Sequence, residues 1–350
     1  MESLARANLC LRTASRVVVR VANFQAQAFH ELERLARAIA WERFITPGTP
    51  VRFRVTARKS RLYHTGAIEE RFAEAIEHRL GKASKTSRST SDEETEAPGP
   101  KAQLFVVRAI RDVFTVSADS SGDLLHQRGY RQAIGKAPMR ETLAAAMLMA
   151  AGWDGSTPLI DPMCGSGTIP IEGALIARRI APGLNRTFAF LEWPESDIER
   201  WTAIRAEAQS VALSESPVRI RGSDRDAGAV EAARSNAQRA GTEVEFSVRA
   251  LSALDCVPGE VGTIATNPPY GVRVGQAAPL RDLYARLGQL LRTRCKGWQL
   301  LMLSANLRLE SQLELQMREL IRTRNGGIPV RILAGPAKDW DAAPTAPASC

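Results

Sequence analysis

The 350-residue chain is long enough for two or three domains, because a single hydrophobic core stops growing at roughly 250 to 300 residues. A hydrophobic content of 44% and a charged content of 24% are those of a globular protein and exclude a disordered or fibrous one. The net charge of +9 lies almost wholly in residues 1–150, which carry 24 Lys and Arg against 16 Asp and Glu.

This basic excess suggests a polyanionic partner. Six cations follow one another with no acid between them: Arg43, Arg52, Arg54, Arg58, Lys59 and Arg61. Such a run suits a phosphate backbone, although an arginine-rich face that only contacts water is the commoner case.

Cysteines, histidines and apolar runs exclude several protein classes. The five cysteines (Cys10, Cys164, Cys256, Cys295 and Cys350) are scattered without a spacing typical of a disulfide framework or a zinc site. The four histidines are equally dispersed, so we expect no metal. No apolar run approaches the roughly 20 residues of a membrane span. Arginines interrupt the N-terminus, unlike a signal peptide, and a cytoplasmic protein is predicted.

In chain order, the first 120 residues predict an α+β unit. Val17, Val19 and Val21 alternate as in a strand, and apolar residues at 29–39 recur with helical spacing. A strand at 50–56 and an amphipathic helix at 68–80 follow, and further strands are expected at 103–110 and 112–118. The intervening segment 82–100 is rich in Ser, Thr and charge, which predicts a disordered loop.

From about Glu141, helices alternate with short apolar strands. The strands are predicted at 159–161, 218–223, 244–248, 263–266 and 299–304. This order is typical of an α/β fold with a parallel, doubly wound sheet. Asn325, Gly326 and Gly327 separate two further apolar segments, which predicts an antiparallel hairpin at the sheet edge.

A glycine-containing loop follows the first strand of this sheet and opens a helix: Asp161, Pro162, Met163, Cys164, Gly165, Ser166, Gly167 and Thr168. Glycines let the backbone approach a ligand, and the helix N-terminus offers free amides. The next strand ends at Asp224, whose carboxylate can accept both ribose hydroxyls of an adenosine-type cofactor or can cap the helix that starts near Asp226. A P-loop and a dinucleotide fingerprint are both incomplete here.

The segment Asn267-Pro268-Pro269-Tyr270 directly follows the fourth strand, at a carboxyl end where open α/β sheets bind ligands. An exocyclic amine of adenine or guanine is a poor nucleophile because its lone pair is delocalised into the ring. If the Asn267 side chain and the Pro268 carbonyl each accept an N–H, the lone pair can face a methyl sulfonium, and catalysis is mostly positioning and electrostatics. Two prolines stiffen the backbone, and Tyr270 offers a face for stacking a flipped base.

Two alternatives exist for these residues. Asn-Pro also favours a plain turn. A cysteine nucleophile would serve carbon-5 pyrimidine methylation, but neither Cys164 nor Cys256 lies beside the substrate motif, and we expect both to be structural.

With these motifs the chain resembles the THUMP-domain class I RNA methyltransferases, of the 23S rRNA guanine-N2 type and its tRNA-modifying relatives. The matching stretches are 125–131, 137–143, 161–168 with Glu172, 222–224 and 267–271. The resemblance implies S-adenosyl-L-methionine (AdoMet) as the cofactor and structured RNA as the partner, with 23S rRNA ahead of tRNA. It also implies a partial ferredoxin-like subdomain at 1–27, a THUMP domain at 28–119, a Rossmann-like methyltransferase domain at 120–338 and a tail at 339–350.

Three sets of site residues follow from the motifs and the resemblance. The catalytic set is Asn267, Pro268, Pro269 and Tyr270. The cofactor set is Thr142, Asp161, Pro162, Cys164, Gly165, Ser166, Gly167, Thr168, Glu172, Asp224 and Asn267. The RNA-binding set is Arg52, Arg54, Arg58, Lys59, Arg61 and Arg131; the last, like Arg128, is equally suited to an interdomain junction.

The chain departs from its relatives in two places. Arg249-Ala250-Leu251 replaces the acid that holds the adenine amine, and Asp255 is the candidate substitute. The chain also begins inside the ferredoxin-like subdomain, which predicts a truncated or mis-started reading frame. Adenine-N6 methylation of RNA or DNA uses the same Asn-Pro-Pro-Tyr chemistry and stays open, as does a non-catalytic RNA-binding factor.

Overall fold

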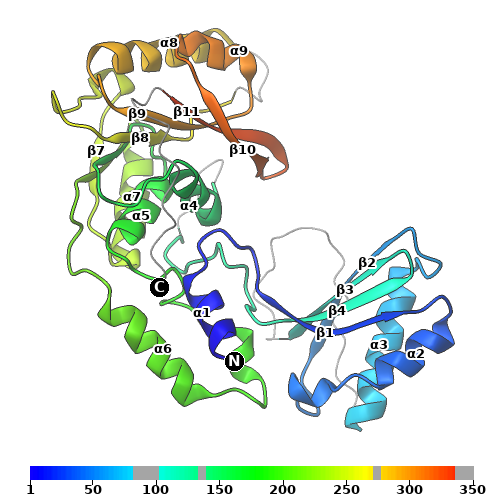
Figure 1. Ribbon diagram of the computed structural model, residues 1–350. Helices are drawn as coiled ribbons and strands as arrows, with labels where there is room; N and C mark the ends of the chain where they lie inside the picture. The colour runs from blue at the N-terminus through cyan, green and yellow to red at the C-terminus, as the bar shows by residue number, and fades with distance from the viewer. Residues whose placement is uncertain (82–101, 133–138, 271–276, 336–350) are drawn as a thin grey trace. The chain divides into compact units, whose positions relative to one another are not determined.

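The structure, a computed structural model, describes residues 1–81, 102–132, 139–270 and 277–335 (Figure 1). The chain forms two compact units. The first contains Met1–Leu9, Ala14–Leu125 and Arg186–Arg205, and the second contains Cys10–Thr13, His126–Asn185 and the chain from Ala206 onward. The first unit thus includes a segment, 186–205, that the boundaries expected from the sequence assign to the methyltransferase domain. The loop predicted at 82–100 and the tail at 339–350 lie outside the described residues.

The first unit is built on a mixed four-stranded sheet with the strand order β1-β4-β3-β2. Its strands are β1 (Val18–Gln25), β2 (Val51–Arg58), β3 (Gln103–Ile110) and β4 (Val113–Asp119). Its helices are α1 (Glu2–Cys10), α2 (Phe29–Arg37) and α3 (Thr65–Leu80), with the 3-10 turns η1 (Trp41–Arg43) and η2 (Ala189–Glu192). β2 and β3 run parallel, whereas β4 pairs antiparallel with both β1 and β3. The strands and helices predicted in this region are confirmed, with ends shifted by a few residues.

Side chains alternate along β2 because successive residues of a strand point to opposite faces. Val51 and Phe53 are buried, whereas Arg54 is exposed. Helices α2 and α3 lie on one face of the sheet (Figure 1), and the ring centroid of Phe53 lies 5.8 Å from those of Phe72 and Phe105. Apolar side chains therefore face the helices, and the arginines of β2 face away from them.

The second unit is an α/β domain with a seven-stranded sheet in the order β10-β11-β9-β8-β5-β6-β7. Its strands are β5 (Leu159–Asp161), β6 (Ile220–Asp224), β7 (Glu245–Val248), β8 (Thr263–Thr266), β9 (Gln299–Ser304), β10 (Arg318–Asn325) and β11 (Ile328–Gly335). Strands β5 to β9 pair in parallel, and β10 and β11 form the antiparallel hairpin predicted at Asn325. The predicted α/β class with a doubly wound sheet is confirmed.

Helices cover both faces of this sheet because its strands are apolar on both sides. The helices are α4 (Glu141–Ala150), α5 (Thr168–Ala177), α7 (Ala227–Ala240), α8 (Ala277–Thr293) and α9 (Leu307–Glu310), with η3 (Leu251–Ala253) and η4 (Ser311–Leu313); α6 (Ile198–Ser210) contains the boundary between the units. In β9, Leu301 and Leu303 pack with residues of α4 and α5, and Leu300 and Met302 pack with residues of α8. Among the described residues, no helix is long and apolar enough to cross a bilayer.

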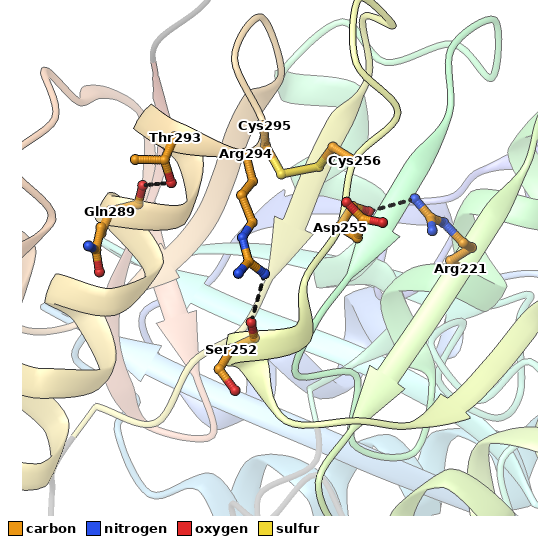
Figure 2. Close-up of a disulfide and its surroundings, with 8 residues drawn as sticks. All are labelled: Arg221, Ser252, Asp255, Cys256, Gln289, Thr293, Arg294 and Cys295. Carbon is orange, nitrogen blue, oxygen red and sulfur yellow. Dashed lines mark hydrogen bonds between the residues drawn. A yellow bond between two sulfur atoms is a disulfide. The ribbon is translucent and has the colours of Figure 1, made fainter.

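A disulfide joins Cys256 and Cys295, although the spacing of the cysteines is not typical of a disulfide framework (Figure 2). Cys256 lies in the segment before β8, and Cys295 follows α8, 39 residues later. The parallel pairing of β8 with β9, beginning at Thr263 and Gln299, brings these segments together. A spacing of that length carries no local signal, so only the sheet topology reveals the pair. Among the described residues, neither Cys10 nor Cys164 forms a disulfide.

Candidate active site

Three motifs that lie far apart in the sequence meet at one edge of the seven-stranded sheet. Strand β5 pairs with β6 on one side and with β8 on the other, so the strand order reverses direction between β5 and β8. Open α/β sheets bind ligands at such a switch point, at the carboxyl ends of the strands. Asp161 ends β5, Asp224 ends β6, and Asn267 directly follows β8. The sheet therefore brings the predicted cofactor and reaction motifs to the same edge.

The glycine loop after β5 is fixed by hydrogen bonds to the end of β6. The Cys164 amide donates to the Ser223 carbonyl at 2.9 Å, and the Gly165 amide donates to Oδ2 of Asp224 at 3.0 Å. Gly167 has φ +84°, and a Cβ placed on it would lie 2.9 Å from the Phe246 ring. Gly165 has φ +52°, but a Cβ there would meet nothing within 4 Å. The loop is therefore closed on the Gly167 side and has free space at Gly165.

Asp224 keeps the capacity to bind a ligand. Its Oδ1 accepts from the Asp226 amide and its Oδ2 from the Gly165 amide, both at 3.0 Å. Each carboxylate oxygen has two lone pairs, so one on each oxygen stays available. Asp226 itself caps α7, because its Oδ1 accepts from the Gly228 amide at 2.9 Å. The alternative in which Asp224 caps this helix is therefore wrong.

Asp161 shapes the loop from within. Its side chain is buried, and Oδ1 accepts from the Met163 amide at 3.1 Å. Burial raises the pKa of Asp161 to about 7, against the lowering effect of the Met163 amide. Burial likewise raises the pKa of the Cys164 thiol, which makes a nucleophilic thiolate at this position unfavourable.

The cofactor set divides into buried and accessible members. The buried members are Thr142, Asp161, Pro162, Cys164, Gly167, Thr168 and Glu172. The half-exposed members are Gly165, Ser166, Asp224 and Asn267. A ligand can touch the half-exposed members directly. The buried members support the half-exposed ones.

Glu172 stands inside α5 in a buried polar cluster. The Tyr130 hydroxyl donates to Oε1 of Glu172 at 3.2 Å, and Nε of Arg128 lies 3.5 Å from the same oxygen. Arg128 also donates to the Arg12 carbonyl at 2.5 Å. Oε2 of Glu172 has no hydrogen-bond partner among the described residues. These contacts give the motif at 125–131 a structural role in supporting the helix that follows the glycine loop.

Arg131 does not belong to an RNA-binding surface. Its side chain is 12% exposed, forms a 3.0 Å ion pair with Glu141 and donates to the Met139 carbonyl at 2.5 Å. The guanidinium thus fixes the start of α4, where Thr142 follows Glu141. Burial raises the pKa of Glu141 to about 7, and the nearby Arg131 opposes that shift. The RNA-binding role expected for Arg131 is therefore corrected to a structural one.

The reaction motif is held from two sides. The Tyr270 hydroxyl donates to Oδ1 of Asn267, and the Tyr284 hydroxyl on α8 donates to the Pro269 carbonyl at 3.4 Å. Pro268 is buried, Asn267 is half-exposed, and the Tyr270 ring packs against the core on the α4 side. Burial raises the pKa of the Tyr270 phenol, so its hydroxyl stays protonated and donates. The sequence does not predict the hydrogen bond from Tyr284, because a tyrosine inside an amphipathic helix is expected to be a core residue.

The place expected for an adenine-binding acid remains without one. Arg249 and Ala250, directly after β7, are exposed, and the Arg249 amide donates to the Asp224 carbonyl at 2.9 Å. Asp255 is exposed as well, and its backbone carbonyl accepts from Arg221 at 3.0 Å (Figure 2). The backbone after β7 is thus tied to the end of β6.

The remaining predicted RNA-binding residues belong to the first unit. β2 is the edge strand of its sheet. Arg54, Arg58, Lys59 and Arg61 are exposed there, and Arg52 is half-buried. Within the part of the chain that the structure describes, no group of three or more His, Cys, Asp or Glu residues could hold a metal ion.

Comparisons with known proteins show the family to which the chain belongs. Residues 128–333 match the UPF0020 family model, described as RMKL-like, methyltransferase domain. The chain is 37% identical over 346 residues, 95% of its length, to the ribosomal RNA large subunit methyltransferase K/L of Syntrophotalea carbinolica, of which the match covers 48%. The chain thus spans about half the length of the first curated relatives it matches.

Two solved structures extend the comparison to the whole fold. One, described as a predicted N6-adenine-specific DNA methylase from Listeria monocytogenes, is 32% identical with a TM-score of 0.82 and covers 96% of this chain and 86% of its own. The other, the methyltransferase SMU.472 complexed with SAH, is 30% identical with a TM-score of 0.80 and covers 97% and 88%. The family model alone covers more than half of the chain, which therefore belongs to the UPF0020 family with an RMKL-like methyltransferase domain.

Proposed function

We propose that this chain is an AdoMet-dependent RNA methyltransferase that modifies the exocyclic N2 amine of a guanine in 23S rRNA. The observation that carries the proposal is the position of Asn267 and Pro268 after β8, the strand that pairs with the one leading into the glycine loop. Family membership supports methyl transfer. The name of the K/L relative supports ribosomal RNA as the substrate, and the motifs resemble those of guanine-N2 enzymes.

AdoMet fits the residues at this edge. The free lone pairs of Asp224 suit the two hydroxyls of a ribose, and the space at Gly165 suits a ligand lying against the loop backbone. The similar structure SMU.472 is complexed with SAH, the product that AdoMet leaves after methyl transfer. Bound AdoMet would supply an electrophilic methyl group on a sulfonium. The protein has to bring the amine of the base to that methyl group.

The residues of the reaction motif orient the amine of the base. Oδ1 of Asn267 already accepts from the Tyr270 hydroxyl and keeps a second lone pair for one N–H of the amine. The Pro268 carbonyl accepts the other N–H, which turns the nitrogen lone pair toward the methyl group. Because the motif contains no group that acts as a base at neutral pH, catalysis rests on position and electrostatics.

RNA binding is assigned to the first unit, as a THUMP domain at 28–119. The exposed cations Arg54, Arg58, Lys59 and Arg61 support this assignment, because exposed cations on one strand and its following loop can neutralise consecutive phosphates. We further propose a cytoplasmic location, since the ribosomal RNA substrate is found there.

Adenine-N6 methylation is the second candidate. Asn267 and Pro268 can orient the N6 amine of adenine in the same way, and the similar Listeria structure is described as an N6-adenine-specific DNA methylase. Guanine in tRNA is the nearest variant of the first proposal. The methylated product must therefore be identified to decide which base is modified and in which nucleic acid.

The decisive experiment incubates the protein with labelled AdoMet and separately purified rRNA, tRNA and DNA from a strain that lacks the corresponding gene. Mass spectrometry of the digested nucleosides should find the label in N2-methylguanosine from rRNA. Label found only in methyladenosine would support the second candidate. Calorimetry that detects no AdoMet binding to the full chain would instead favour a non-catalytic RNA-binding factor.

The matched variant is Asn267→Ala. It should bind AdoMet almost as the wild type does, because the glycine loop and Asp224 stay intact, and yet form no product, because the oxygen that orients the amine is lost. Loss of both properties together would mean that Asn267 is needed for folding of the site.

A further inference from the structure

At one end of the four-stranded sheet, two loops that contain several cations are joined by hydrogen bonds. β2 ends at Arg58, and β3 turns into β4 through Arg111 and Asp112. The Arg111 amide donates to the Arg58 carbonyl at 3.1 Å, and the Asp112 amide donates to Oγ of Ser60 at 3.0 Å. The loop after β2 and the β3–β4 turn therefore form one structured surface.

Four cations lie exposed on this surface: Arg58, Lys59, Arg61 and Arg111. We call them the basic rim. Other arginines of the first unit, such as Arg43 and Arg79, are paired with acids, but none of the ion pairs between described residues includes a rim cation. Within the described parts of the first unit, the rim cations therefore have no ion-pair partner.

Asp112, the acid nearest to the rim in sequence, accepts hydrogen bonds from neutral donors and forms no ion pair with a described rim cation. Asp112 uses Oδ1 to accept from the Arg61 backbone amide at 2.6 Å and Oδ2 to accept from Nε2 of Gln27 at 3.2 Å. Lys59 and Arg111 adopt φ values of +52° and +51°, a conformation that costs a residue other than glycine roughly 1 to 2 kcal/mol. Long cationic side chains therefore occupy two positions where glycine would relax the backbone.

An exposed aromatic pair follows the rim in the chain. Leu62 is buried, but Tyr63 is 65% exposed and is the only aromatic among the large apolar side chains that lie exposed in the described residues. The ring centroids of Tyr63 and His64 lie 4.3 Å apart, and the angle between the two ring planes is 33°. An exposed flat ring that follows several exposed cations in the chain combines the two features with which proteins bind single-stranded nucleic acid.

We propose that Tyr63, backed by His64, is a stacking platform for an unpaired base of the RNA substrate, and that the basic rim binds the phosphates beside that base. In a duplex both faces of each base are covered by neighbouring bases, so a ring on the protein surface can stack only on a base that is unpaired or at an end. The platform thus gives the first unit a preference for single-stranded segments over uninterrupted duplex. This inference rests on the proposed function in taking RNA as the substrate.

The test compares Tyr63→Ala with the wild type on three RNA probes: a single strand, a hairpin with a single-stranded extension, and a blunt duplex. Fluorescence anisotropy should show affinity for the first two probes falling roughly 5- to 150-fold, the range expected for one lost base–aromatic stack. Affinity for a long blunt duplex, in which only the two terminal base pairs expose a face, should fall by much less. Tyr63→Phe and Tyr63→Trp should retain wild-type binding, because the stacking ring is kept.

The rim is tested separately through salt dependence. Arg58→Ala combined with Arg61→Ala should weaken binding to all three probes and reduce the slope of log affinity against log salt by about 0.7 for each lost contact on a single strand. Arg34→Ala combined with Arg37→Ala, which removes two exposed arginines from α2 in the same unit, is the matched control and should have little effect.

The outcomes separate this inference from the proposed function. Equal affinities of Tyr63→Ala and the wild type for every probe, or an equal loss on the blunt duplex, would overturn the platform. A wild-type protein that binds the probes with the expected preference but transfers no methyl group to RNA would leave the platform standing and contradict the proposed activity.

Discussion

The Tyr270 hydroxyl donates a hydrogen bond to Oδ1 of Asn267, so one residue of the reaction motif orients another. An asparagine amide that is free to rotate can present its nitrogen in place of its oxygen, and the nitrogen cannot accept an N–H from the base. In this structure the Tyr270 hydroxyl donates to the oxygen, so this contact favours the orientation that presents Oδ1.

Tyr270→Phe should therefore lower kcat while leaving AdoMet affinity unchanged. A single lost hydrogen bond corresponds to a fall of about 3- to 10-fold. Tyr284→Phe is the matched control, since its hydroxyl reaches only the Pro269 carbonyl, and its effect on kcat should be smaller. A Tyr270→Phe enzyme with wild-type kcat would show that Asn267 is oriented by other contacts.

The two loop glycines should differ in their tolerance to alanine. Gly167→Ala forces a Cβ to within 2.9 Å of the Phe246 ring and should lower the free energy of unfolding by about 1 to 3 kcal/mol, in addition to its backbone cost. Gly165→Ala meets open space and should show only the backbone cost of roughly 1 to 2 kcal/mol. Urea unfolding of both variants measures the difference. A double variant that adds Phe246→Ala should recover part of the loss at Gly167, and no recovery would contradict the steric explanation.

Stability should depend on pH through Asp161. Its pKa is raised by burial from 3.8 to about 7, so the folded protein binds a proton more tightly than the unfolded chain does. The free energy of unfolding should therefore fall as the pH rises from about 4 to 7, by an amount on the order of 4 kcal/mol at most. Asp161→Asn removes the titrating group, and its unfolding curve across this window should be flatter than that of the wild type. Parallel curves would exclude Asp161 as the source.

The Cys256–Cys295 disulfide should make stability sensitive to reductant. Opening a loop of 39 residues costs roughly 3 to 4 kcal/mol in the chain-entropy model, so wild-type protein should unfold at lower urea when reduced. A variant with both cysteines changed to serine should behave like the reduced protein under either condition. Mass spectrometry of peptides from non-reduced protein checks the pairing directly, and free thiols at both positions would contradict it.

The order of elements and the cofactor and reaction motifs could be predicted from the sequence because each has a local signal. Short apolar runs separated by helical spacing gave β5, β8 and β9 with the correct ends, and the Asn-Gly-Gly turn gave the β10–β11 hairpin. Asp161, Asp224 and Asn267 were identified because each follows such a run, and parallel strands end at the same edge.

Contacts between segments that are distant in the sequence could not be predicted in this way. The disulfide depends on the pairing of β8 with β9, and the burial of Arg131 depends on the carboxylate of Glu141 and the carbonyl of Met139. From the sequence alone an arginine is predicted to be a surface cation, because its partner is not visible there. The support of Pro269 by Tyr284 has the same origin, because it joins two elements through the fold alone.

Both units are discontinuous in the sequence: the chain passes between them five times, and the first unit is complete only with Arg186–Arg205. During synthesis on the ribosome, which proceeds from the N-terminus, the first unit cannot finish folding until residue 205 has been made. By then the glycine loop and α5 of the second unit already exist. A fragment that starts at residue 120 would also lack Arg12, whose guanidinium donates to the Leu175 and Ile180 carbonyls and whose own carbonyl accepts from Arg128. We therefore expect the two units to complete their folding together.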